Sequence, residues 1–172
     1  MTRLEGWSSV TMAGLAARVG VSRQTVYNEL GSKPALAEAL VMNELAVFLG
    51  AVDDAFGRHP DDLVAAIRAA VRSVLEMALE NPLLHAVLAA GHGAGSDLLP
   101  LLTTQSEPLL DAARAVIAQR FLQYDVPLSP REVDATIEMV VRLTLSHVMR
   151  PSQAPARTAA DIAWLAQRVV DA

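Results

Sequence analysis

The sequence predicts an all-α protein, and three observations support this fold class. Apolar residues recur in three- and four-residue steps over long stretches, which is the period of amphipathic helices. No segment alternates apolar and polar residues for long enough to indicate a strand, and no internal repeat is visible. Serine, threonine, glycine and proline stand where such helices would begin and end.

The first part of the chain is predicted to contain two short helices and one long one. Thr11 would cap a helix over residues 12–19, and Ser22 would cap a second over residues 23–30. Gly20 follows the first helix and supplies the left-handed conformation that commonly ends a helix, and Gly31 stops the second. The third helix is expected to be capped by Ser32, to begin near Pro34 and to end at Gly57.

The remaining helices follow from similar signals. Ser129-Pro130-Arg131-Glu132 is a capping box with proline at the first helical position, which is a specific start signal. The other expected elements are a helix from Asp61 to Asn81-Pro82, a short helix over 82–90, a flexible GHGAGS connector at 91–96, a short piece over 97–104, a helix from Ser106 through Tyr124, a helix over 129–149 broken by Pro151, and a last helix from Thr158 to 171.

Composition excludes several classes of protein. The chain has 172 residues, 52% of them hydrophobic and 4% aromatic, so most of it should pack rather than remain disordered. The absence of cysteine excludes disulfides, thiolate zinc sites and cysteine nucleophiles, and it suits a reducing compartment. The N-terminus lacks a signal-peptide core, and no continuous apolar stretch approaches the roughly 18 residues of a membrane span. A cytoplasmic location is expected.

The charge is unevenly distributed along the chain. Residues 1–34 carry four basic and two acidic side chains, a net charge of +2. The total of −5 therefore leaves −7 for residues 35–172. A small basic head on an acidic body allows local contact with phosphates, although chance would also explain so small an asymmetry.

Two short helices joined by a glycine-containing turn indicate a helix-turn-helix, whose second helix lies in the DNA major groove. Gly20 would supply the positive φ of the turn, and Ala16 would be small because the helices cross closely there. A small core is expected to hold the pair together, formed by Leu15, Ala16, Val19, Val21 and Val26. Trp7 and Trp164 are expected to be packing residues.

Polar residues of the second helix are candidates for DNA contact. Arginine can make two hydrogen bonds to guanine, and glutamine or asparagine can do the same with adenine. Thr11, Tyr27 and Lys33 are better suited to phosphates, which fix register without reading sequence. The predicted DNA-binding residues are Thr11, Ser22, Arg23, Gln24, Thr25, Tyr27, Asn28 and Lys33.

Residues 6–36, GWSSVTMAGLAARVGVSRQTVYNELGSKPAL, resemble the DNA-binding segment of the tetracycline-repressor (TetR) family of bacterial transcriptional regulators. The order Gly-Val-Ser, Thr-Val-Tyr and Ser-Lys carries the resemblance, with matches at Gly6, Thr11, Leu15, Ala16, Gly20, Val21, Ser22, Thr25, Val26, Tyr27, Ser32, Lys33 and Leu36. Leu30 replaces the usual phenylalanine. The resemblance implies a homodimeric repressor with an effector pocket in its C-terminal helices.

The expected organisation is a DNA-binding head over residues 1–34 and a ligand-binding and dimerisation domain over residues 35–172. Family members carry an amphipathic helix before the glycine that matches Gly6, and five residues are too few to form it. Two interpretations remain open. The chain is truncated at its start, or the DNA-binding head is incomplete.

The helices at 129–149 and 158–171 correspond in position to the pair that forms the family's dimer interface. They carry more apolar residues than a surface helix needs. An isologous four-helix bundle would bury these residues, and an intramolecular core is the alternative. The residues in question are Val133, Ile137, Val140, Val141, Leu145, Ile162, Leu165 and Val169.

An effector pocket is expected among the helices at 61–80, 82–90, 106–124 and the inner face of 129–149, although most of its apolar wall residues are ordinary core by default, because apolar stripes usually mean packing. The aliphatic composition suits an acyl or otherwise lipophilic ligand. His85 and His147 could supply polar handles or be satisfied helix histidines. The candidates are Met77, Leu84, His85, Leu88, Leu110, Val116, Phe121, Met139, Leu143 and His147.

The sequence shows no constellation for catalysis, metal binding or a cofactor. The four histidines lack the spacing of metal ligands, and GHGAGS lacks the ending of a phosphate loop. The predicted function is a one-component regulator, a dimer on an inverted-repeat DNA operator released by a small effector. The alternative is a helical ligand-binding or protein-interaction domain with a non-functional head.

Overall fold

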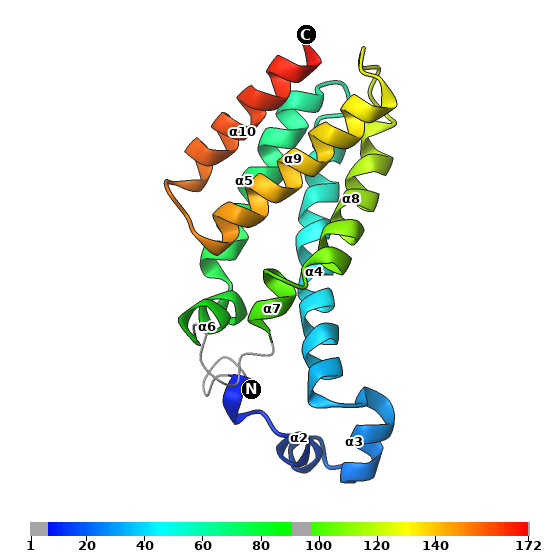
Figure 1. Cartoon of the computed structure of the whole chain (residues 1–172), viewed down its shortest axis with the longest axis vertical. Helices are drawn as coiled ribbons and strands as arrows, with labels where there is room; N and C mark the ends of the chain where they lie inside the picture. The colour runs from blue at the N-terminus through cyan, green and yellow to red at the C-terminus, as the bar shows by residue number, and fades with distance from the viewer. Residues whose placement is uncertain (1–6, 91–97, 172) are drawn as a thin grey trace. The chain divides into compact units, whose positions relative to one another are not determined.

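The computed structural model describes residues 7–90 and 98–171. Within them the chain is helical and contains no strand, which confirms the predicted all-α fold class (Figure 1). The elements are η1 (Trp7–Ser9), α2 (Met12–Val19), α3 (Arg23–Leu30), α4 (Lys33–Arg58), α5 (Leu63–Glu80), α6 (Pro82–Ala90), α7 (Leu99–Leu102), α8 (Glu107–Phe121), α9 (Pro130–Met149) and α10 (Pro155–Val170). The predicted connector at 91–96 lies outside the described residues.

The chain divides into two compact units. The first unit comprises Met1–Leu45 and Asn81–Ser106, and the second unit comprises Ala46–Glu80 and Glu107–Ala172. Helix α4 belongs to both, because it passes from the first unit to the second between Leu45 and Ala46. The predicted domain boundary at residue 34 stays a prediction.

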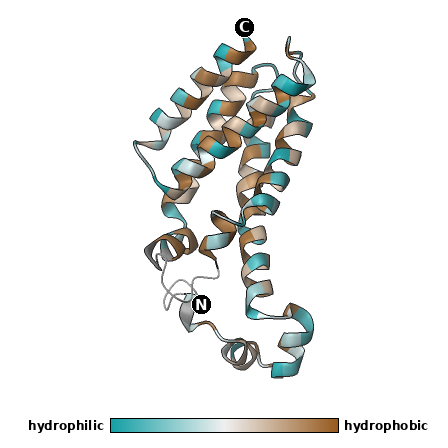
Figure 2. Cartoon of the chain, viewed as in Figure 1, coloured by the Kyte–Doolittle hydropathy of each residue, from teal (hydrophilic) through white to brown (hydrophobic). Residues whose placement is uncertain are grey.

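The second unit is a helical bundle around one apolar core. Helix α10 packs along α5, and α9 packs against α8, α5 and α10. Ala66 of α5 and Ala159 and Ala166 of α10 are completely buried, and such small side chains allow helices to approach closely. Each of these helices carries both apolar and polar residues, as the brown and teal segments of Figure 2 show. Larger side chains of the core include Phe56, Ile67, Leu75, Leu110, Ile117, Phe121, Ile137, Val140, Val141 and Ile162.

Several predicted helix ends are wrong by a few residues. Asp62, not Asp61, caps α5, because its Oδ1 accepts from the Ala65 amide at 2.9 Å. Helix α8 ends at Phe121 rather than Tyr124, and Tyr124 lies in the turn that follows, where its hydroxyl donates to the His59 carbonyl. Helix α10 begins at Pro155, which leaves Thr158 buried inside the first turn instead of capping it.

Helix α4 is the one element of the described chain that is long and apolar enough to cross a membrane by length and composition. Core helices of globular proteins pass the same test. Val52, Ala55 and Phe56 of α4 are buried in the core of the second unit, which accounts for part of this apolar character.

Candidate nucleic-acid interface

Helices α2 and α3 and the turn between them form a two-helix motif over residues 11–31. Thr11 caps α2 by accepting from the Gly14 amide at 3.0 Å, as predicted. Gly20 ends α2 with φ 76° and ψ 29°, the left-handed conformation predicted for it. The Ala16 carbonyl accepts from the amides of both Gly20 and Val21, at 3.0 and 3.1 Å. These bonds fix the direction in which the chain leaves α2 and enters α3.

A small core joins α2 to α3, but its membership differs from the prediction. Met12, Ala16 and Val26 are buried together, with Leu15 and Leu36 packed against them. The prediction that Val19 and Val21 belong to this core is wrong, because 69% and 40% of their surfaces are exposed. Val19 is the last residue of α2 and Val21 lies in the turn that follows, and the small core centred on Ala16 and Val26 does not extend to either. Met12 was missed, although it stands four residues before Ala16 and therefore on the same helical face.

The start of α3 carries two hydroxyl groups in contact with each other. Ser22 accepts from the Thr25 amide at 3.0 Å and thereby caps the helix. The two side-chain oxygens of Ser22 and Thr25 lie 2.8 Å apart. The cap therefore fixes the backbone at the start of α3. This is the positive end of the helix dipole, where an anionic group is favoured.

The outer face of α3 is polar and open to solvent. Val26 is the one residue of α3 buried by the fold. The predicted contact residues are all exposed, and Gln24 donates to Asn28 at 2.8 Å across one helical turn. These exposed residues are Arg23, Gln24, Thr25, Tyr27 and Asn28. Hydrogen-bond donors and acceptors thus cover the face that a recognition helix turns to DNA.

The two predicted phosphate contacts outside α3 differ in their surroundings. Thr11 is exposed, but its hydroxyl oxygen already caps α2. Lys33 begins α4, and its Nζ lies 5.3 Å from the ring centroid of Trp7, a cation–π distance. Trp7 is buried, as expected for a packing residue, and the contact ties η1 to the start of α4.

The predicted effector residues are spread over both units. Leu84, His85 and Leu88 lie on α6 in the first unit, where His85 is exposed and the two leucines are half-buried. In the second unit Leu110 and Phe121 are buried in the core, whereas Met77, Val116, Met139 and Leu143 are half-buried. His147 has a partner, since its Nδ1 lies 3.3 Å from the Ser152 hydroxyl. Their role in binding an effector stays a prediction.

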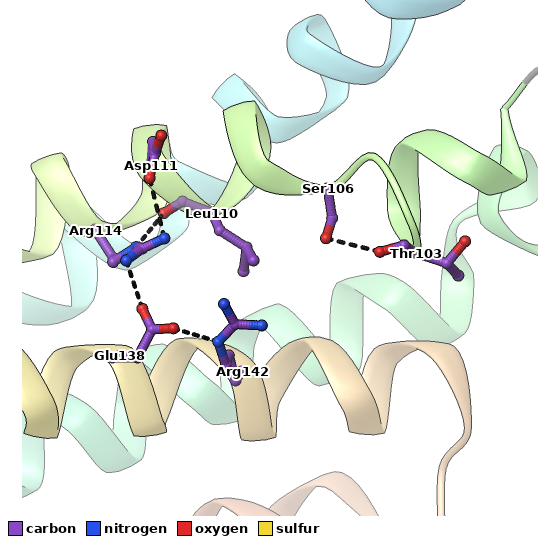
Figure 3. Close-up of polar contacts among 7 residues, drawn as sticks. All are labelled: Thr103, Ser106, Leu110, Asp111, Arg114, Glu138 and Arg142. Atoms are coloured by element: carbon purple, nitrogen blue, oxygen red, sulfur yellow. Dashed lines mark hydrogen bonds and ion pairs between the residues drawn. The ribbon is translucent and has the colours of Figure 1, made fainter.

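A chain of charged groups crosses from α8 to α9 in the second unit (Figure 3). The Arg114 guanidinium contacts Asp111 at 3.0 Å and Glu138 at 2.8 Å, and Glu138 also pairs with Arg142. The hydrogen bond from Arg142 lowers the pKa of Glu138, and both arginine charges contribute. Sequence reasoning missed this network. The spacings of Asp111–Arg114 and Glu138–Arg142 were visible in the sequence, but the bond between the helices was not.

The predicted dimer residues of α9 and α10 divide into two groups. Ile137, Val140, Val141 and Ile162 are buried in the core of the second unit, so the intramolecular alternative holds for them. Val133, Leu145 and Val169 are half-buried, and Leu165 is 37% exposed. Its neighbour Trp164 was expected to pack, but 55% of its surface is exposed, with the Arg168 guanidinium carbon 5.6 Å from the ring centroid.

Comparison with known proteins identifies the family. Residues 62–168 match the model described as the C-terminal domain of the bacterial tetracycline repressor, and residues 3–40 match that of the bacterial regulatory proteins of the tetR family. The HTH-type transcriptional regulator AlkX of Mycobacterium tuberculosis is 31% identical over 159 residues, which cover 92% of this chain and 74% of that protein.

The fold is similar to that of a solved relative. The crystal structure of the TetR family repressor AlkX from a Dietzia species, implicated in biodegradation of n-alkanes, has a TM-score of 0.76 at 27% identity. The match covers 95% of this chain and 90% of that one. The chain therefore belongs to the TetR family of bacterial transcriptional regulators, which are DNA-binding transcription factors and not enzymes.

Proposed function

We propose that this chain is a repressor that binds an inverted-repeat operator as a homodimer and is released by a small lipophilic effector. Regulators of this family bind DNA and small-molecule effectors and act as dimers. The observation that carries the proposal is the exposed polar face of α3, held on a capped helix behind a left-handed glycine turn. Arg23, Gln24 and Asn28 would contact base edges. The residues that would contact the DNA backbone are Thr11, Ser22, Thr25, Tyr27 and Lys33.

Exposed apolar residues on α10 support a homodimer. Trp164 and Leu165 are adjacent and exposed, although large apolar side chains are usually buried. A two-fold axis beside α10 would bring each of these residues against the same surface of a second copy. Such a dimer would present two α3 helices to half-sites about 34–36 Å apart.

Two observations support a lipophilic effector. The chain combines a high hydrophobic fraction with few aromatic residues, which suits an aliphatic ligand better than a flat cation. The solved relative is itself implicated in biodegradation of n-alkanes. We expect a cytoplasmic protein in which effector binding changes the tilt of α4, the helix that both units share. Native mass spectrometry of the purified protein that found only polar small molecules bound would contradict this part of the proposal.

Selection from randomised duplexes tests the DNA-binding proposal. The wild-type chain should select an inverted repeat, bind it with two copies per duplex and lose affinity steeply as salt rises, because phosphate contacts release counterions. Tyr27→Ala should weaken binding to all sequences by a similar factor, whereas Gln24→Ala should relax the preference at one base pair of each half-site.

Gln167→Ala is the matched control for Gln24→Ala. It removes another glutamine, half-buried on α10, which donates to Asp171 at 2.7 Å far along the chain from the motif. This variant should select the wild-type sequence. A wild-type protein that selects no sequence would overturn the proposal and favour a ligand-binding domain with a non-functional head.

A further inference from the structure

Two side-chain amides are joined on the outer face of α3. Gln24 Nε2 donates to Asn28 Oδ1 at 2.8 Å, and both residues are exposed. Each stands two positions from the buried Val26, so each lies about 160° around the helix axis from it. The pair therefore occupies the middle of the face that points away from α2.

We propose that Gln24 and Asn28 read DNA as one unit, in which Asn28 orients Gln24 toward an adenine and donates to a neighbouring base itself. This inference rests on the proposed DNA-binding function and deepens it by naming the bases. Gln24 is the reading residue, and Asn28 is a positioning residue for it with a contact of its own.

The bond to Asn28 leaves Gln24 with the groups that adenine requires. A primary amide carries two N–H donors and one carbonyl acceptor. One donor is used on Asn28, which leaves one N–H and Oε1. Adenine presents N7 as an acceptor and N6 as a donor in the major groove, so the free pair matches it. The same bond restricts the rotamers of Gln24, which would otherwise lose that freedom on binding.

The bond leaves both N–H donors of Asn28 free. Its Oδ1 uses one of its two lone pairs to accept from Gln24, and its Nδ2 keeps two hydrogens. Guanine and thymine present acceptors in the major groove, O6 and N7 or O4, so Asn28 should favour one of these two bases. Four residues of helix span about 6 Å, which places this second target one or two base pairs from the adenine.

A purely structural role for the pair makes a different prediction. Amide pairs four residues apart also stabilise helices, and loss of such a pair would lower stability without favouring one base over another. The ratio of affinities for two duplexes that differ at one base pair therefore distinguishes the roles. A uniform loss of binding cancels in that ratio.

The experiment compares base preference among variants of the full chain, with duplexes substituted at each position of the selected half-site. Gln24→Ala identifies the base pair read by Gln24, where a preference of roughly tenfold to a hundredfold for adenine should fall to near unity. Asn28→Ala should reduce this adenine preference severalfold and remove the preference at the neighbouring base pair. The double variant should match Gln24→Ala at the adenine position, because Asn28 acts there only through Gln24.

Asn28→Asp is the conservative variant that separates the two parts of the proposal. Its carboxylate still accepts from Gln24 but has no donor, so the adenine preference should be retained. The neighbouring preference should move to a base that donates, such as cytosine. The carboxylate will also weaken binding to every duplex through phosphate repulsion, which the ratio removes.

The outcomes distinguish this inference from the function on which it rests. If the wild-type chain selects no sequence, the proposed function fails. If it selects one and Asn28→Ala leaves the preference at the Gln24 position unchanged, or if that preference is not for adenine, the amide-pair inference is overturned. Gln167→Ala serves as the control, since it breaks an i, i+4 amide–carboxylate bond outside the motif and should change no base preference.

Discussion

Two glycines end the helices of the two-helix motif in different backbone conformations. Gly20 has φ 76° and ψ 29°, which lies in the left-handed helical region. Gly31 has φ 70° and ψ −112°, which lies outside it. An added Cβ would meet nothing within 4 Å at Gly20 and only the Ala35 Cβ at 3.6 Å at Gly31. Backbone strain, and not crowding, therefore decides which side chains these positions accept.

Asparagine should be tolerated at Gly20 and not at Gly31. Asparagine visits the left-handed region more readily than other residues, so Gly20→Asn should cost less than about 1 kcal/mol. Gly31→Asn forces an L-residue into a conformation that few adopt, at a cost of about 1–3 kcal/mol. Urea unfolding of both variants measures the difference. Equal losses would show that the conformations of the two glycines do not decide their tolerance.

At the scale of the element, Ser129 and Glu132 start α9 with a complete capping box. The Ser129 hydroxyl donates to Glu132 Oε2 at 2.6 Å, and the Ser129 amide donates to the same oxygen at 2.8 Å. The hydrogen bonds from Ser129 lower the pKa of Glu132, the side-chain bond most strongly. This element was predictable because all its signals lie within four consecutive residues.

Ser129→Ala should destabilise the protein at neutral pH by about 1 kcal/mol, the usual cost of removing an N-cap side chain. The deficit should shrink in acid. Because the folded-state pKa of Glu132 is lowered, its contribution is present above the ordinary glutamate value of about 4.3 and is lost as pH falls through the folded value. Urea unfolding at pH 7 and pH 3 measures the difference between variant and wild type. A deficit that grows on acidification would contradict the assigned role of Glu132.

At the scale of the whole molecule, contacts between segments far apart in sequence tie the helices together. Tyr124 follows α8 and donates to the His59 carbonyl at 2.7 Å, beyond the end of α4. Its ring packs edge-on against Phe56, with the centroids 6.1 Å apart. Burial raises the pKa of the Tyr124 hydroxyl above its ordinary value of 10.0, so its ionisation lies still further from neutral pH, where it is a donor. Asp53 and Arg120 add an ion pair between α4 and α8.

Tyr124→Phe should lower the free energy of unfolding by about 0.5–1.5 kcal/mol, because it removes the hydrogen bond and keeps the ring. Amide hydrogen exchange in the last turn of α4 should quicken, since the His59 carbonyl that follows this turn loses its 2.7 Å bond and keeps only the bond from the Asp62 amide at 3.4 Å. Tyr27→Phe is the control, because Tyr27 is 49% exposed and its loss of a hydroxyl should leave stability unchanged. Equal stability of Tyr124→Phe and wild type would exclude a role for this bond.

Asn81 links the start of α6 to α4 by hydrogen bonds that helical periodicity does not reveal. Its Oδ1 accepts from the amides of Leu83 and Leu84 at 2.9 and 3.0 Å and so caps α6. Its Nδ2 donates to Glu44 of α4 at 2.8 Å, within the first unit. The sequence predicted that a helix ends at Asn81-Pro82, but not that the same side chain holds α4.

The sequence by itself determined the helices, most of their caps and the two-helix motif. Caps, turns and helical period depend on residues within a few positions of one another, so they can be predicted without knowledge of the fold. Only the tertiary structure decided where each apolar face goes. It placed Ile137 and Ile162 in the core, left Trp164 and Val19 exposed, and joined Arg114 to Glu138. The physical reason is that a helical period shows that a face is apolar but not which surface covers it.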